Sequence, residues 1–128
     1  MKFTRQQIKL AQRLKEAGMP WDPQPGHFVW DGESLIEHDS PFHDRVFFIL
    51  DLKHFLRRSE TIENLIKKCC WLPDWFHARQ LLRDRGVTDQ EIQHHLEKSR
   101  AIESGTELDE LYKLLLDPLA TGGQDRDG

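Results

Sequence analysis

Histidine and acidic side chains, the residue types that most often bind metals, gather in one stretch of the chain. The set is His27, Asp31, Glu37, His38, Asp39, His43 and Asp44. Imidazole and carboxylate groups suit zinc, iron or manganese, but their spacing here matches no established metal motif. A metal site at His38, His43 and Asp44 would suit a small metal-dependent hydrolase. The alternative, which we favour, is a solvated loop whose acids complement a basic helix.

Cys69 and Cys70 are the only cysteines, and they are adjacent. A catalytic thiolate needs a nearby base, for which His54 or His77 are the candidates. Cys69 also follows Leu65 at helical spacing, which is typical of a small buried residue. We favour the buried role. Because there is no disulfide framework, a reducing cytoplasm is the expected location.

The sequence contains none of the common motifs for nucleotide binding or nucleophilic catalysis. We find no G-x-S-x-G, no P-loop and no G-x-G-x-x-G, so we expect no cofactor, and an enzyme is the less favoured interpretation. The apolar runs are far shorter than the ~20 residues that span a bilayer. The N-terminal residues are polar and lack the apolar stretch of a secretory signal, so we expect no membrane association.

Basic side chains line one side of the first predicted helix, where Arg5, Lys9 and Arg13 recur every four residues. Residues 1–17 carry five basic and one acidic side chain, so the rest of the chain has a net charge of −8 within a total of −4. No Lys or Arg occurs between Glu16 and Asp44, a stretch with seven acids. We predict that these three residues bind an acidic surface, either residues 22–44 of the same chain or a second copy. A solvated helix face is the alternative.

Residues 74–103 resemble a helix–turn–helix unit in outline, with a glycine turn near Gly86. The second helix of this unit would begin with Asp89 and Glu91, which would face the bases of a bound nucleic acid. Acidic and basic side chains are balanced over residues 74–100, which is not the charge pattern of a phosphate-binding surface. An ordinary pair of antiparallel helices is therefore favoured, and nucleic acid is the least favoured partner.

The N-terminal pattern predicts a helix over about residues 5–17. Thr4 and Gln7 form a capping-box signature, and Phe3 and Ile8 occupy the positions of a hydrophobic staple. Gly18 is suited to end the helix.

A small antiparallel sheet is predicted next. Phe28 to Trp30 leads into Asp31-Gly32, a preferred type I′ turn, and then into residues 33–36. Residues 46–50 form an apolar run typical of a strand that is buried on both faces. We predict an α+β fold with a three-stranded antiparallel meander, covered by the N-terminal helix and a C-terminal run of helices.

The C-terminal half reads as helical. Five helices are predicted. The first follows Asp51, the second runs from Ser59 to about Cys70, and the third begins at Pro73. The fourth extends over residues 89–103 with Ile102 on its apolar face, and the fifth begins at Thr106. Residues 1–119 are predicted to form a single domain, and residues 120–128 a disordered tail. The predicted core comprises Leu10, Leu14, Phe28, Trp30, Val46, Phe48, Leu65, Trp75, Leu82, Ile92, Leu96 and Leu111.

These observations favour a non-enzymatic binding module that contacts another protein or self-associates. The charge asymmetry and the four tryptophans motivate this interpretation, since aromatic residues recur at interfaces. The alternatives are a small metal-dependent hydrolase using the histidines and acids of residues 27–44, and a nucleic-acid-binding protein.

Overall fold

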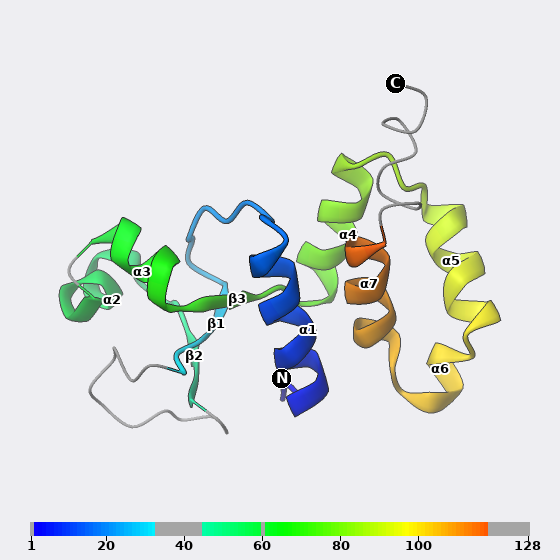
Figure 1. Cartoon of the computed structure of the whole chain (residues 1–128), viewed down its shortest axis with the longest axis horizontal. Helices are drawn as coiled ribbons and strands as arrows, with labels where there is room; N and C mark the ends of the chain where they lie inside the picture. Colours follow the sequence, from blue (N-terminus) through cyan, green and yellow to red (C-terminus); the bar gives the residue numbers. More distant parts are fainter. Residues whose placement is uncertain (1, 33–44, 60, 118–128) are drawn as a thin grey trace. The chain divides into compact units, whose positions relative to one another are not determined.

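A computed structural model of the chain describes residues 2–32, 45–59 and 61–117, without the side chains of residues 54 and 57–59. The chain divides into two compact units, residues 1–73 and 74–128, which are described separately (Figure 1). The prediction of a single domain over residues 1–119 stays a prediction. The predicted tail, residues 120–128, lies outside the described residues. Within the described ranges, no helix has the length and apolar character needed to cross a membrane.

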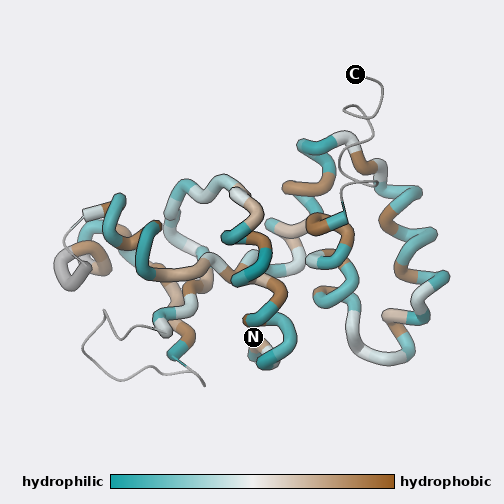
Figure 2. Tube along the Cα trace, in the orientation of Figure 1, coloured by the Kyte–Doolittle hydropathy of each residue, from teal (hydrophilic) through white to brown (hydrophobic). Residues whose placement is uncertain are grey.

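The first unit begins with helix α1, Arg5–Glu16. The predicted capping box is present, because the Thr4 hydroxyl accepts from the Gln7 backbone N–H and the Gln7 side chain accepts from the Thr4 N–H. Gly18 has a φ of 89°, the left-handed conformation that commonly ends a helix at glycine. Figure 2 shows hydrophilic and hydrophobic positions alternating along α1, as expected of a helix with one buried face.

Three short strands form the sheet, namely β1 (Phe28–Trp30), β2 (Val46–Phe48) and β3 (Cys70–Leu72). Both pairings are antiparallel, and the strand order is β2-β1-β3. The predicted α+β class, with helices before and after a three-stranded antiparallel sheet, is confirmed. The order of the described strands is not that of a meander, since β1 is central. The third strand was not predicted, and it begins at Cys70, where the predicted helix was expected to end.

Each face of the sheet packs against a different set of helices. Phe28 contacts Phe3, just before α1, with ring centroids 5.2 Å apart. Because side chains alternate along a strand, Trp30 lies on the same face of β1 as Phe28. The opposite face presents Val29, which is fully buried in a cluster with Ile49, Leu65 and Cys69. The two faces of β1 therefore contribute to two separate apolar layers.

The predicted strand over residues 46–50 is wrong at its C-terminal end, because β2 ends at Phe48 and Leu50 is 80% exposed. Val46, Phe47 and Ile49 are buried, as predicted for this run. β2 is an edge strand of the described sheet, with β1 at the centre.

Helix α2 covers Leu52–Ser59 and helix α3 covers Ile62–Lys68, and they lie side by side (Figure 1). The predicted helix from Ser59 to Cys70 is therefore wrong at both ends. Thr61 caps α3, its hydroxyl accepting from the backbone N–H of Asn64, and Cys70 belongs to β3. Ile62, the first residue of α3, is 40% exposed.

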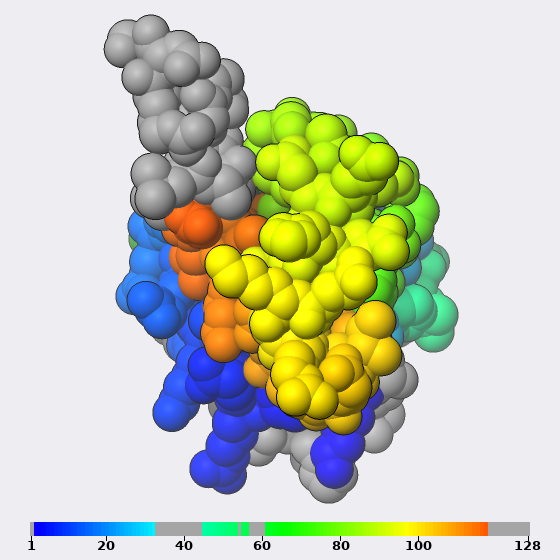
Figure 3. All heavy atoms as spheres, turned by 90° about the vertical axis from the view of Figure 1, so that its right-hand side faces the viewer, coloured from blue at the N-terminus to red at the C-terminus, as the bar shows by residue number. Residues whose placement is uncertain are grey.

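The second unit contains α4 (Trp75–Asp84), α5 (Asp89–Lys98), α6 (Ala101–Ser104) and α7 (Glu107–Leu116). In Figure 3, α5 and α6 occupy the near face of this unit, with α7 visible beside them. The helix predicted to begin at Pro73 begins at Trp75, and Asp74 caps it by accepting from the His77 backbone N–H. The predicted helix over 89–103 is interrupted at Arg100, whose φ is 57°, and this change of direction leaves Ile102 61% exposed.

Most of the predicted core is confirmed. The buried members are Leu10, Leu14, Val46, Leu65, Leu82, Ile92, Leu96 and Leu111. The aromatic members are only half-buried, namely Phe28, Trp30, Phe48 and Trp75. Their partial exposure leaves aromatic surface available for other contacts.

Candidate functional site

Three exposed cations form the basic face of α1, defined here as Arg5, Lys9 and Arg13. Their spacing of four residues places them one helical turn apart, away from the buried Leu10 and Leu14. In the part of the chain that the structure describes, none of the three makes an ion pair. Their positive charge is therefore available to a partner.

A hollow of about 370 Å³ opens beside this basic face. Its lining comes from α1, β1 and the segments next to β1 and β2, namely Arg5, Ile8, Lys9, Gln12, Trp30, Gly32 and Arg45. Trp30 and Ile8 supply apolar surface, while Arg5 and Lys9 supply positive charge. The hollow thus combines an aromatic wall with a cationic rim, two features that favour binding of an anionic molecule with an apolar part.

Gly32 lies against the ring of Trp30. A Cβ atom built on Gly32 would lie 2.3 Å from Cη2 of Trp30, which is closer than any side chain can approach. Its φ is not in the left-handed region, so the predicted type I′ turn at Asp31-Gly32 is wrong, because that turn needs a positive φ there. The glycine is required for close packing on the ring, and the predicted strand over residues 33–36 lies outside the described residues.

Asp31 and Arg45 connect the ends of β1 and β2. Nη2 of Arg45 lies 2.9 Å from Oδ2 of Asp31, which is fully buried, and the Asp31 backbone N–H donates to the Arg45 carbonyl. The Arg45 guanidinium also lies 4.8 Å from the centre of the Phe47 ring. Since Asp31 neutralises Arg45, Arg5 and Lys9 are the cations lining the hollow that have no ion-pair partner among the described residues.

The metal-site candidates His38, His43 and Asp44 lie outside the described residues, so that site stays a prediction. His27 is buried, where Nδ1 accepts a hydrogen bond from Nε1 of Trp21 and the imidazole stacks on Trp71 with centroids 4.6 Å apart. Among the described residues, no group of three or more His, Cys, Asp or Glu side chains is arranged to hold a metal ion.

Neither cysteine is in an environment that favours a thiolate. Burial raises the pKa of Cys69 to about 12, aided by the nearby Asp31 carboxylate, to which the Cys69 thiol donates over 3.8 Å. Burial likewise raises the pKa of Cys70 to about 12. A nucleophilic cysteine needs the opposite shift, so these thiols fit the favoured role of buried residues.

The raised thiol pKa values give the protein an expected alkaline sensitivity. Well below pH 9.0 the thiols are protonated in both the folded and the unfolded chain, so their ionisation does not make the free energy of unfolding vary with pH. Between 9.0 and about 12 the unfolded chain loses these protons first, so the free energy of unfolding falls as the pH rises. The free energy of unfolding, measured by urea denaturation at several alkaline pH values, should fall less steeply with pH for Cys69→Ala/Cys70→Ala than for the wild type. Equal slopes for the two proteins would contradict this expectation.

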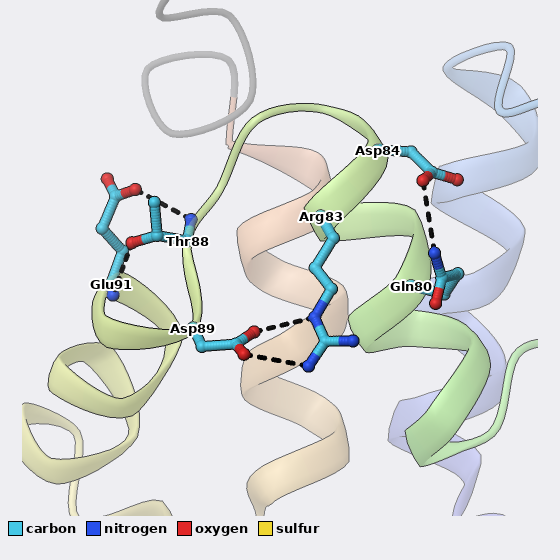
Figure 4. A network of polar contacts seen from close by, with 6 residues as sticks. All are labelled: Gln80, Arg83, Asp84, Thr88, Asp89 and Glu91. Carbon is cyan, nitrogen blue, oxygen red and sulfur yellow. Dashed lines mark hydrogen bonds and ion pairs between the residues drawn. The ribbon is translucent and has the colours of Figure 1, made fainter.

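The two helices that resemble a helix–turn–helix unit, α4 and α5, are joined by an ion pair (Figure 4) and each packs against α7. Nε and Nη2 of Arg83 bind the two carboxylate oxygens of Asp89 at 2.8 and 2.9 Å, and these bonds lower the pKa of Asp89. The backbone N–H of Thr88 lowers the pKa of Glu91 in the capping box. Two ionised acids therefore stand in the first turn of α5, where contact with phosphates or bases would be repulsive.

A second hollow, of about 410 Å³, lies in the unit formed by residues 74–128. Its charged lining combines Glu91 and Lys98 with His94 and His95. His95 is already engaged, since its Nε2 lies 2.9 Å from a carboxylate oxygen of Glu110. The mixed charges give this hollow no preference for ligands of one sign, unlike the hollow beside Trp30.

Sequence reasoning found the basic face but missed Trp30, Gly32 and Arg45 as its neighbours. These three come together through pairing of β1 with β2, which residue spacing does not reveal. The adjacency of tryptophan and glycine near a strand end was the available signal, because glycine often marks a close approach. No family model, curated protein or solved structure matches the chain.

Proposed function

We propose that this protein is a non-enzymatic binding module that docks an acidic protein surface on the basic face of α1. The observation that supports this proposal is the hollow beside Trp30, where Arg5 and Lys9, which make no ion pair among the described residues, lie next to the half-buried Trp30 ring. Aromatic and cationic groups recur together at the centres of protein interfaces. A second copy of the chain is one such acidic partner, since residues 18–128 carry a net charge of −8.

Two further features fit this proposal. The two cysteines are free and buried, in keeping with a reducing compartment such as the cytoplasm. Their raised pKa values make them poor nucleophiles, in keeping with a role other than catalysis.

The proposal predicts that Arg5→Gln/Lys9→Gln/Arg13→Gln weakens binding to polyglutamate about tenfold at low salt. Each exposed ion pair contributes little, so three together give an effect of this size. High salt should weaken wild-type binding, because the contacts are exposed and screened. Calorimetric titration measures the affinity, and sedimentation velocity at low and high salt tests self-association.

The matched control is Lys53→Gln/Lys67→Gln/Lys98→Gln, which removes the same charge from exposed positions elsewhere. The control should bind polyglutamate within about threefold of the wild type, since only general attraction is lost. If both triple variants lose affinity equally, or if neither does, the basic face of α1 is not the binding surface.

A further inference from the structure

The hollow beside Trp30 has the size of a site for one ring. Its volume of about 370 Å³ is at the small end of the ~300–1,000 Å³ typical of ligand pockets. Trp30 offers a flat aromatic surface, and Gly32 carries no side chain to obstruct it. An aromatic side chain that enters the hollow can therefore pack on the Trp30 ring, an arrangement favoured between aromatic groups.

The charged rim adds a spacing requirement. Arg5, Lys9 and Arg13 are each separated by four residues of helix, or about 6 Å along the axis. Alternate side chains of an extended peptide point the same way and are spaced by ~6.6 Å. Acidic residues two positions before and after an aromatic residue are thus ~13 Å apart, close to the ~12 Å that separates Arg5 from Arg13 along the helix. Their carboxylates would meet these cations while the ring between them enters the hollow.

Phosphate recognition is less well supported by the same residues. Phosphate sites commonly use backbone N–H groups at a helix N-terminus or in a glycine-rich loop. At the start of α1, Thr4 and Gln7 already satisfy backbone N–H groups through the capping box. The hollow instead offers separate side-chain cations around an aromatic wall, which matches carboxylates placed around a ring.

We infer that the hollow beside Trp30 selects an acidic, extended peptide segment with one aromatic side chain flanked by acids at alternate positions. This inference rests on the proposed function and adds the chemistry of the partner. The aromatic side chain occupies the hollow and contacts Trp30, and the flanking carboxylates pair with the basic face of α1. Specificity then comes from the ring, and long-range attraction from the acids.

Three capped peptides test the inference by calorimetry with the full chain. The first is Ser-Glu-Ser-Phe-Ser-Glu-Ser, the second replaces Phe by Ala, and the third replaces both Glu by Gln. The first should bind about tenfold more tightly than either of the others, because each loses one of the two contributions. The indole N–H resonance of Trp30, assigned by its loss in Trp30→Phe, should shift most on binding.

Variants separate the ring contact from the charges. Gly32→Ala places a methyl group where the Trp30 ring lies, so it should abolish the preference for Phe over Ala but retain salt-dependent binding. Lys9→Gln should weaken the Phe and Ala peptides alike, by about threefold, whereas the exposed Lys53→Gln should leave both affinities unchanged. Trp30→Leu is the second test of the ring contact should Gly32→Ala fail to fold, as judged by circular dichroism.

The possible failures are distinguishable. Equal affinity of the wild type for the Phe and Ala peptides overturns the inference, while the proposed function stands. Absence of binding to every acidic peptide, together with a basic-face triple variant that behaves like its control, overturns both. Tighter binding of ATP than of the Phe peptide overturns the inference in favour of a nucleotide ligand.

Discussion

In the folded protein, Cys69 and Cys70 are expected to react with a disulfide reagent at neutral to mildly alkaline pH about a thousandfold more slowly than an exposed thiol. The thiolate is the reacting species, and raising the pKa from 9.0 to about 12 lowers its population by that factor. Burial of both side chains adds a requirement for local opening before the reagent can reach them. Absorbance of the released thiol measures the rate.

An engineered exposed thiol in the unit formed by residues 1–73 serves as the reference standard for these reaction rates. Lys53→Cys introduces a thiol at an exposed position of α2, and that thiol should react at the rate of a free cysteine. Cys69→Ala and Cys70→Ala variants identify which native thiol contributes any remaining reactivity. A native thiol that reacts within about tenfold of the standard would revive the catalytic interpretation of this cysteine pair.

Local patterns in the sequence were sufficient to predict helix starts. Thr4 and Gln7 form the predicted capping box, and Thr88 and Glu91 form a second with the same spacing. Such a pattern can be predicted because both partners lie within four residues. The same short range explains Gly18, whose left-handed backbone ends α1. These features need no knowledge of the rest of the fold.

Pairing between distant segments could not be predicted in the same way. β3 is only three residues long and follows directly after α3, so Cys70 and Trp71 continue what reads as a helical pattern. Their strand conformation depends on pairing with β1 some forty residues earlier. The break between α5 and α6 could not be predicted either. It depends on a left-handed backbone at Arg100, a conformation that arginine does not favour.

In the candidate site, too, features set by local spacing were predicted and features set by contacts between distant segments were not. The basic face of α1 depends only on helical spacing and was predicted, whereas the hollow depends on the meeting of α1, β1 and β2. Trp30 was predicted as a core residue because it lies on an apolar face of a strand. In the fold it is only half-buried, and the side chains of Arg5 and Lys9 line the hollow beside it.

Replacement of Arg45 by methionine is expected to lower the free energy of unfolding by about 2–4 kcal/mol. The substitution leaves the fully buried carboxylate of Asp31 without the guanidinium that lies 2.9 Å away. Losses of 3–5 kcal/mol are typical when one partner of a buried pair is removed. A lower range applies here because the Arg45 side chain is 30% exposed and Asp31 retains the hydrogen bond from Cys69.

The double variant Asp31→Asn/Arg45→Met should recover part of this loss, because it removes the buried charge together with its partner. Position 45 has a φ of 63°, and methionine bears the same backbone strain as arginine, so the comparison isolates the ion pair. Urea denaturation measures all three proteins. A loss below ~1 kcal/mol for Arg45→Met, or no recovery in the double variant, would show that the Asp31 charge is stabilised chiefly by other groups.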